Sequence, residues 1–226
     1  MDPENMFNVD DSGYTTVHKP GKVIAKKGKK YVGSLTSAEK GKTITVVCCV
    51  SAVGQYIPPM FVSPRVRMRP DLLDKGPAEA IGVANPSVWI NEELFGVWFD
   101  HFLKLVRPAS RPEPVLINLD GHTSHTKNLT LIEKARENNV VLLSLPSHCT
   151  HRLQPLDVAV FKSINTFYDQ AVATWLAQHP GKIVTEKEIP ELFMIGYGKG
   201  GTIKNAVSGF KKCGIFPFDL EVFTEE

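Results

Sequence analysis

VLINLDGHTSHTKNLTLIEKARENNVVLLSL, residues 115–145, carries the pattern from which the topology can be derived. Val115–Leu119 is a short apolar run, typical of a buried strand, and it stops at Asp120-Gly121. Lys127–Asn138 has the spacing of a short helix, and Val140–Leu145 is a second apolar run. Strand, helix and strand in this order predict two parallel strands that are joined by a right-handed crossover.

Three further strands are predicted upstream of this unit. Met6–Asp10 is a short apolar strand that ends in acids, and residues 11–13 have the composition of a turn. Thr43–Val50 is β-branched and almost wholly apolar, so we expect both of its faces to be covered. Tyr56–Val62 carries two prolines, which cannot donate to a ladder, and is therefore predicted at a sheet edge.

The rest of the chain is predicted to be helical or loop. Residues 64–87 are rich in proline, glycine and charge and are expected to be loop, and Gly196–Gly201 is expected to be a flexible glycine stretch. The expected helices are Asn91–Val106, Lys127–Asn138, Pro155–Gln178, Glu186–Met194 and Ala206–Cys213. This order predicts an α/β fold, a mixed five-stranded sheet with helices on its faces, in one domain that spans residues 1–226.

Composition excludes several classes of protein. The chain has 226 residues, of which 42% are hydrophobic and 22% charged, and this balance is typical of a soluble globular domain. No apolar run approaches the roughly 20 residues of a membrane span, so no membrane association is expected. Four cysteines are too few for a disulfide scaffold. Cys48 and Cys49 are adjacent in a strand and should point to opposite faces of it as buried side chains.

The positive charge is concentrated in one segment. The net charge is only +2, but residues 18–42 contain eight lysines and one acid, and Arg65, Arg67 and Arg69 follow. A solvated Lys-rich loop and a surface that binds phosphate are both open interpretations of this segment. The segment 19–42 is predicted to form a basic hairpin or long loop.

Three aspartates occupy informative positions. Asp10 is predicted to end the first strand, Asp120 ends the fourth, and Asp157 lies in the first turn of the helix after the fifth. If the first and fourth strands are neighbours, the three carboxylates converge, and such a cluster suits Mg²⁺ or Mn²⁺. Each acid also has a simpler interpretation, as a turn residue, a strand-end residue or a first-turn acid favoured by the helix dipole.

Three segments of the chain resemble the catalytic blocks of pogo-type DDE transposases. They are residues 7–13 (FNVDDSG), 116–122 (LINLDGH) and 153–161 (LQPLDVAVF), and residues 33–41, 56–61 and 210–218 also resemble that family. The likeness covers nearly the whole chain, and order and spacing agree as well as residue type. The first block departs from the family's usual Asp-Glu, because Asp11 stands in place of the glutamate.

The resemblance implies a ribonuclease-H-like fold with central strand order 3-2-1-4-5. The family's catalytic and metal-binding triad maps onto Asp10, Asp120 and Asp157. Two Mg²⁺ or Mn²⁺ ions are implied as cofactors, DNA as the partner and the nucleus as the location. The implied activity is that of a metal-dependent endonuclease and strand-transfer domain. The expected DNA-binding residues are basic side chains: Lys19, Lys22, Lys26, Lys27, Lys29, Lys30, His122, His148, His151 and Arg152.

Relatives of this type carry helix-turn-helix domains ahead of the catalytic domain, and none is expected within this sequence. A partner that reads DNA sequence and a homodimer are therefore both considered, and residues 180–226 are expected to be a C-terminal helical extension. A domesticated, catalytically silent module that binds DNA or protein is the alternative function.

Two other features have open interpretations. His122, His125, His148 and His151, together with Cys149, have spacings that a zinc site could use, although a contact with phosphate near the acids is the simpler role. Trp89 lies in a predicted loop, where packing against the core is favoured over stacking on a nucleic-acid base.

Overall fold

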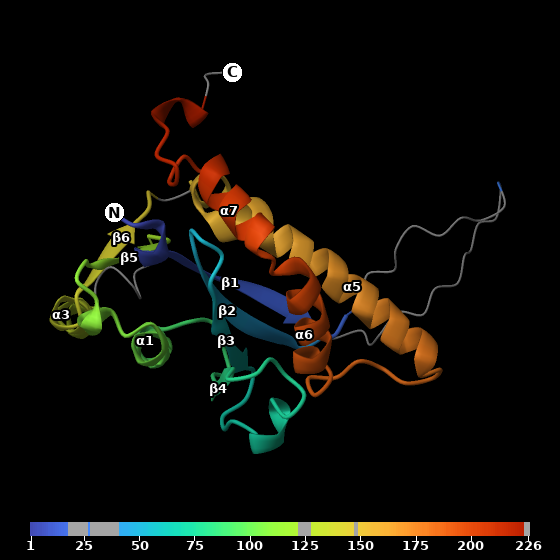
Figure 1. Cartoon of the computed structure of the whole chain (residues 1–226). Helices are drawn as coiled ribbons and strands as arrows, with labels where there is room; N and C mark the ends of the chain where they lie inside the picture. Colours follow the sequence, from blue (N-terminus) through green and yellow to red (C-terminus); the bar gives the residue numbers. More distant parts are fainter. Residues whose placement is uncertain (18–26, 28–40, 122–127, 147–148, 224–226) are drawn as a thin grey trace.

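The computed structural model describes residues 1–17, 27, 41–121, 128–146 and 149–223. These residues form a six-stranded sheet with helices on both of its faces (Figure 1). The sheet has the order β4-β3-β2-β1-β5-β6. Its strands are β1 (Met6–Thr15), β2 (Thr43–Ser51), β3 (Tyr56–Ser63), β4 (Ile81–Ala84), β5 (Val115–Leu119) and β6 (Val140–Ser144). The predicted order 3-2-1-4-5 is confirmed for the five strands β3-β2-β1-β5-β6.

Strand directions also agree with the sequence pattern. β1, β2 and β3 are antiparallel neighbours, whereas β5 is parallel to both β1 and β6. The second half of the sheet is therefore built by crossovers, as the strand-helix-strand unit predicts. This arrangement places β1 and β5 side by side at the centre of the sheet.

The prediction of five strands is wrong by one. Residues 64–87 contain the short helix η2 (Pro70–Leu72) and the strand β4, which pairs in parallel with Met60–Ser63 of β3. β3 is therefore not the edge strand, although Pro58 and Pro59 lie just outside the part that pairs with β4. Proline lacks a hydrogen-bond donor only at its own nitrogen. It therefore indicates an unpaired edge at its own position and not along the whole strand.

The first strand is longer than predicted. Asp10 does not end it, and residues 11–13 do not form a turn, because β1 continues to Thr15 and pairs along most of its length with β2. In this register Asp10 lies opposite Cys48 and Gly13 opposite Thr45. Pairing with a long neighbouring strand overrides the local turn preference of Asp, Ser and Gly.

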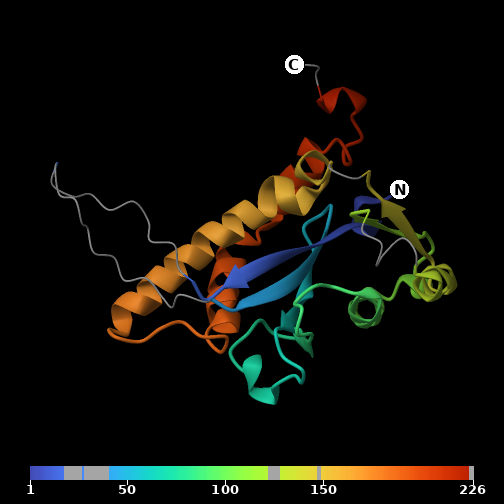
Figure 2. The same cartoon turned by 180° about the vertical axis from the view of Figure 1, so that it is seen from behind.

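Helices cover the two faces of the sheet (Figures 1 and 2). One face packs against α1 (Glu92–Val106) and α3 (Leu129–Glu137), and the other against α5 (Phe161–Gln178), α6 (Ile189–Gly200) and α7 (Ile203–Lys212). The short elements are η1 (Pro3–Asn5), η3 (Pro108–Ser110), α4 (Thr150–Leu153), the π-helical turn η4 (Leu156–Val160) and η5 (Leu220–Val222). Cys48 and Cys49 are buried on opposite faces, as predicted.

The glycine stretch after residue 195 is helical and not flexible. α6 begins at Ile189 and continues to Gly200, in contrast to the helix expected over residues 186–194. The helix continues because its glycines face α5: a Cβ on Gly196 would lie 2.9 Å from the Tyr168 backbone nitrogen, and one on Gly200 would lie 2.5 Å from that of Ile164. These two glycines let α5 and α6 approach closely.

The C-terminal helices form part of the core. Phe193 of α6 and Phe210 of α7 are buried in the same cluster as Val160 and Ile164. α7 approaches η4 so closely that a Cβ on Gly209 would lie 2.6 Å from the carbonyl oxygen of Pro155. The segment that carries Asp157 is thus packed between α7 and the sheet.

Candidate active site

The three predicted acids come from three separate elements. Asp10 lies in the middle of β1, Asp120 directly follows β5, and Asp157 is in the turn η4. The parallel register pairs Asn8 with Asn118, so two residues later Asp10 and Asp120 are on the same side of the sheet. η4 lies over that same side, where Leu156 and Val160 join the core cluster.

Burial and neighbouring charges change the acidity of Asp10. Burial raises the pKa of its carboxyl from 3.8 to about 8, and the negative charge of Asp157 adds to this rise. The backbone amide of Asp11 donates to Asp10 Oδ1 at 2.9 Å and works in the opposite direction. The negative charges of Asp11 and Asp120 also raise the pKa of Asp10.

Asp157 responds to the same neighbours. Burial raises its pKa and the charge of Asp120 contributes to the rise, whereas a hydrogen bond with Asp10 and the charge of His151 lower it. Desolvation thus raises the pKa of both carboxyls, and the charge of Asp120 adds to the rise in each.

The donor chemistry of these acids fits a hard divalent cation. Within the described ranges, no three His, Cys, Asp or Glu side chains are gathered into a set that could hold a metal ion. Mg²⁺, however, is commonly held by one or two carboxylates together with waters and substrate phosphates and does not need a cage of protein ligands. Paired carboxylates with raised pKa values meet that requirement.

Asp10, Asp11 and Asp120 line one small cavity together with Ile90 and Phe95. Trp89, next to Ile90, is 74% exposed, so the expectation that it packs against the core is wrong. Its indole is presented to solvent beside a residue that lines the acidic cavity.

The predicted basic residues are only partly described. Lys19, Lys22, Lys26, Lys29, Lys30, His122 and His148 lie outside the described residues, as does most of the predicted basic hairpin, and Lys27 is exposed. His151 and Arg152 are exposed on α4, and His151 is near enough to Asp157 to lower its pKa. Of the residues considered for zinc, His122, His125 and His148 are likewise outside the described part of the chain.

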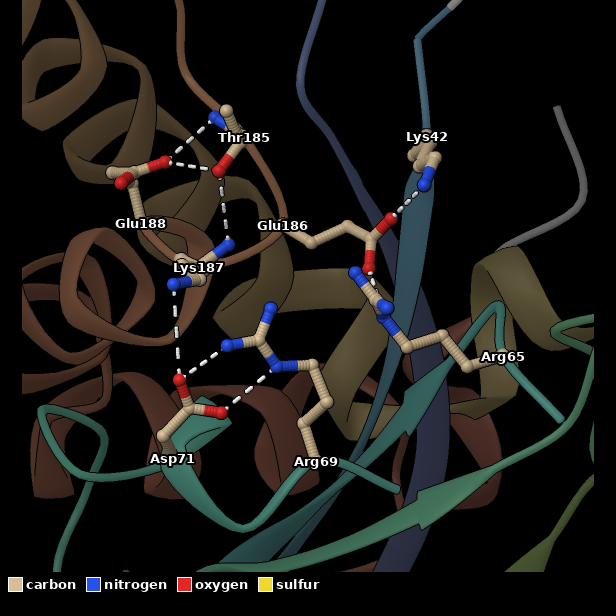
Figure 3. Close-up of polar contacts among 8 residues, drawn as sticks. All are labelled: Lys42, Arg65, Arg69, Asp71, Thr185, Glu186, Lys187 and Glu188. Atoms are coloured by element: carbon tan, nitrogen blue, oxygen red, sulfur yellow. Dashed lines mark hydrogen bonds and ion pairs between the residues drawn. The ribbon is translucent and has the colours of Figure 1, made fainter. Parts of the chain in front are cut away.

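A second charged cluster lies where β1 ends and β2 begins (Figure 3). Glu186, which is 3% exposed, forms ion pairs with Lys42 and with Arg65, whose Nε lies 2.7 Å from Glu186 Oε2. Asp71 pairs with Arg69 and, at 3.8 Å, with Lys187. Arg65 and Arg69 are thus engaged with acids, a feature that the run of arginines in the sequence does not reveal.

Comparisons with known proteins agree with this fold. The Mos1 mariner paired end complex with Mn has a TM-score of 0.54 and 16% identity, covering 99% of this chain and 58% of that chain. A pre-cleavage Mos1 transpososome has a TM-score of 0.53 and 16% identity, covering 98% of this chain and 57% of the other. The expected ribonuclease-H-like arrangement, a mixed sheet flanked by helices, is thereby confirmed.

A relative among curated proteins is similar over most of this chain but is much longer. It is the MFS-type transporter clz9 of Cochliobolus lunatus, 24% identical over 225 residues, which are 97% of this chain and 24% of that protein. The chain therefore spans about a quarter of this relative and a little over half of the Mos1 chains. No helix among the described residues has the length and apolar character needed to cross a membrane.

A family model provides the assignment that the solved structures alone do not. Residues 40–207 match the model of the DDE superfamily endonuclease, and this range contains every strand after β1 as well as Asp120 and Asp157. Because the match extends over most of the sequence, the chain belongs to the DDE superfamily endonuclease family.

Proposed function

We propose that this chain is the metal-dependent DNA endonuclease and strand-transfer domain of a pogo-type transposase. The observation that carries the proposal is that Asp10 and Asp120 line one cavity while Asp157, from a third element, acts electrostatically on Asp10: burial raises the pKa of Asp10, and the charges of Asp157 and Asp120 add to the rise. Repulsion between neighbouring carboxylates destabilises the folded protein, and a cation bound between them would relieve it.

The three aspartates would hold the cofactor, which we propose to be two Mg²⁺ or Mn²⁺ ions. When bound, such ions supply activation of an attacking oxygen and stabilisation of the leaving oxygen in phosphoryl transfer. Solved Mos1 complexes with Mn and with Mg support the choice of ion. Burial and the charges of neighbouring acids raise the pKa of Asp10, and His151 lies near enough to Asp157 to lower the pKa of that carboxyl.

We propose that the basic residues hold the DNA backbone on either side of the acids. Arg152 and His151 are exposed on α4, shortly before Asp157 in the chain, and can contact phosphates next to it. The lysines of residues 19–30 would extend this contact, and the exposed indole of Trp89 would stack on a base. Mos1 structures are of paired-end and strand-transfer complexes, which supports DNA ends as the substrate and assembly of two copies as the working form.

Plasmid nicking tests the proposed function. Supercoiled plasmid incubated with the chain and Mn²⁺ or Mg²⁺ should be nicked at scattered positions, because no groove-reading helix-turn-helix is expected in the sequence. Asp10→Asn and Asp120→Asn should reduce nicking to background, whereas Asp74→Asn, an exposed acid near η2, should leave it unchanged. DNA binding without nicking by the wild-type chain would instead favour the silent module, and retained nicking in both active-site variants would exclude the triad. Nuclear location is proposed from the DNA substrate and would be tested by imaging of a tagged chain.

A further inference from the structure

Buried amide side chains precede the three acids at nearly the same spacing. Asn8 and Asn118 lie two residues before Asp10 and Asp120, and Gln154 lies three residues before Asp157. The exposed fractions of Asn8, Asn118 and Gln154 are 0%, 2% and 1%. Burying an amide side chain costs folding free energy unless the amide is hydrogen-bonded. The hydrogen-bond partners therefore show what these side chains hold in place.

Asn8 is the centre of a network that joins all three segments. Its Nδ2 donates to the main-chain oxygen of Asn118 at 3.1 Å and to Gln154 Oε1 at 2.8 Å. Its Oδ1 accepts from the backbone N–H of Leu156 at 2.9 Å. A single side chain of β1 thus bonds to β5, to the residue that precedes η4 by two, and to the first residue of η4.

These partners fix the orientation of the Asn8 amide. The Leu156 N–H needs an oxygen and the Asn118 carbonyl needs an N–H, so exchanging Oδ1 and Nδ2 would break both bonds. The network therefore has one arrangement, and it determines both the distance and the rotation of η4 relative to the strands. Apolar packing in the same place would fill the space without such direction, because the hydrophobic effect is non-directional.

The direction of the network matters because each amide is close in the chain to one of the acids. Strand alternation places Asp10 on the same face as Asn8 and Asp120 on the same face as Asn118. The bond to Leu156 holds the residue immediately before Asp157, while α7 contacts the preceding Pro155. The position of the Asp157 backbone thus depends directly on Asn8, a residue far from it in the sequence.

We infer that Asn8 and Gln154 are positioning residues, which hold the η4 segment so that Asp157 lies near Asp10 and Asp120 at the proposed metal site over the centre of the sheet. This inference rests on the proposed function, because it assigns the network a role in metal binding and not only in folding. Both side chains are buried and bonded to protein atoms, so their role would be exerted through Asp157. Partners that orient metal ligands in this way typically contribute about 10–100-fold to metal affinity.

The test uses Asn8→Leu and Gln154→Met, which keep side-chain size but remove the amide. Mn²⁺ affinity is measured by electron paramagnetic resonance titration, with the folded state checked by circular dichroism and thermal melting. We expect the Mn²⁺ Kd to rise about 10–100-fold in both variants. In Asn8→Leu, the backbone amide of Leu156 should also exchange its hydrogen faster, because its acceptor is gone.

Asn205→Leu is the matched control, since Asn205 Nδ2 donates to the Gly200 carbonyl at 2.8 Å and joins α6 to α7 without a bond to any acid-bearing segment. It should bind Mn²⁺ like the wild type. If Asn8→Leu does not fold, Gln154→Met carries the test, because it removes the acceptor for Asn8 Nδ2 and keeps the bond that the Leu156 N–H donates to Asn8 Oδ1.

Two negative outcomes have different meanings. Wild-type affinity in both folded variants, with only a lowered Tm, would overturn the positioning role and leave the proposed function standing. Absence of Mn²⁺ binding by the wild-type chain would overturn the proposed function, and the positioning role with it.

Discussion

Asp10 shows how a single residue couples folding to the chemistry of the site. Its carboxyl is half-buried in β1 and lies near the charges of Asp157 and Asp120, and the desolvation and both charges favour the protonated form. In the unfolded chain the same carboxyl has its ordinary pKa of 3.8. The folded state therefore binds a proton that the unfolded state releases, and stability must depend on pH.

The sign of this dependence follows from the raised pKa. The contribution of Asp10 is fully present below about pH 4 and is lost as the pH rises through about 8. The unfolding free energy of the metal-free wild type should therefore fall relative to that of Asp10→Asn as the pH rises over this range. Urea unfolding of both proteins at pH 4, 6 and 8 measures the difference.

Comparing the wild type with Asp10→Asn cancels the contributions of other groups, such as Glu186, whose effect on stability changes with pH in the opposite direction. At Glu186 burial raises the pKa, but ion pairs with Lys42 and Arg65 lower it below its usual value, so that carboxylate favours stability at higher pH in both proteins. A difference in unfolding free energy that stays constant from pH 4 to 8 would show that Asp10 has an ordinary pKa.

At the scale of an element, α6 shows how glycine can serve packing and not flexibility. Gly196, Gly198 and Gly200 lie in the same helix. Gly196 and Gly200 face the backbone of α5, whereas a Cβ on Gly198 would meet nothing within 4 Å. The three positions therefore provide an internal comparison between helix propensity and close packing.

We expect opposite effects of alanine at these positions. Gly196→Ala and Gly200→Ala should lower the unfolding free energy by about 1–3 kcal/mol, because the new Cβ meets backbone atoms of α5 that cannot move aside. Gly198→Ala should raise it by up to about 1 kcal/mol, since alanine favours helix over glycine. Thermal and urea unfolding measure both. Equal stabilisation by all three would show that α5 and α6 do not pack closely at Gly196 and Gly200.

At the scale of the whole molecule, the acidic site and the ends of the lysine-rich segment are separated along β1. Asp10 lies in the middle of the strand, whereas Thr16 and Lys42, which flank residues 18–40, are hydrogen-bonded to each other beyond its end. Six residues of strand span about 20 Å, roughly the length of half a turn of DNA. This length is compatible with the proposed contact of one duplex with both the lysine-rich segment and the acids.

Neutralising four lysines should change the salt dependence of DNA binding. Replacement of Lys26, Lys27, Lys29 and Lys30 with glutamine should flatten the slope of log K against log salt by about 0.9 for each phosphate contact that is lost. Fluorescence anisotropy with a duplex of arbitrary sequence gives the slope. The same replacement at Lys75, Lys104, Lys134 and Lys182 is the control. An unchanged slope in the first variant would make residues 19–42 a solvated loop.

Features that depend on neighbours in the chain could be predicted from the amino-acid sequence alone. The apolar run Thr43–Val50 is a strand buried on both faces, and Asn91 caps α1 by accepting from the Leu94 N–H at 2.9 Å. The order of the acid-bearing segments was also sufficient to indicate the family. Burial period, capping and motif spacing are local properties, and a single sequence carries them in full.

Features that depend on segments far apart in the chain were settled only by the folded structure. β1 continues past Asp10 because nine of its residues pair with β2. α6 contains Gly196 and Gly200 because the backbone of α5 lies too close for a Cβ at these positions. Ile81–Ala84 is a strand because it pairs with β3. The Asn8 network likewise joins residues 110 and 146 positions apart. Local sequence does not determine these features, because their conformation is selected by the free energy of contacts that exist only after the chain has folded.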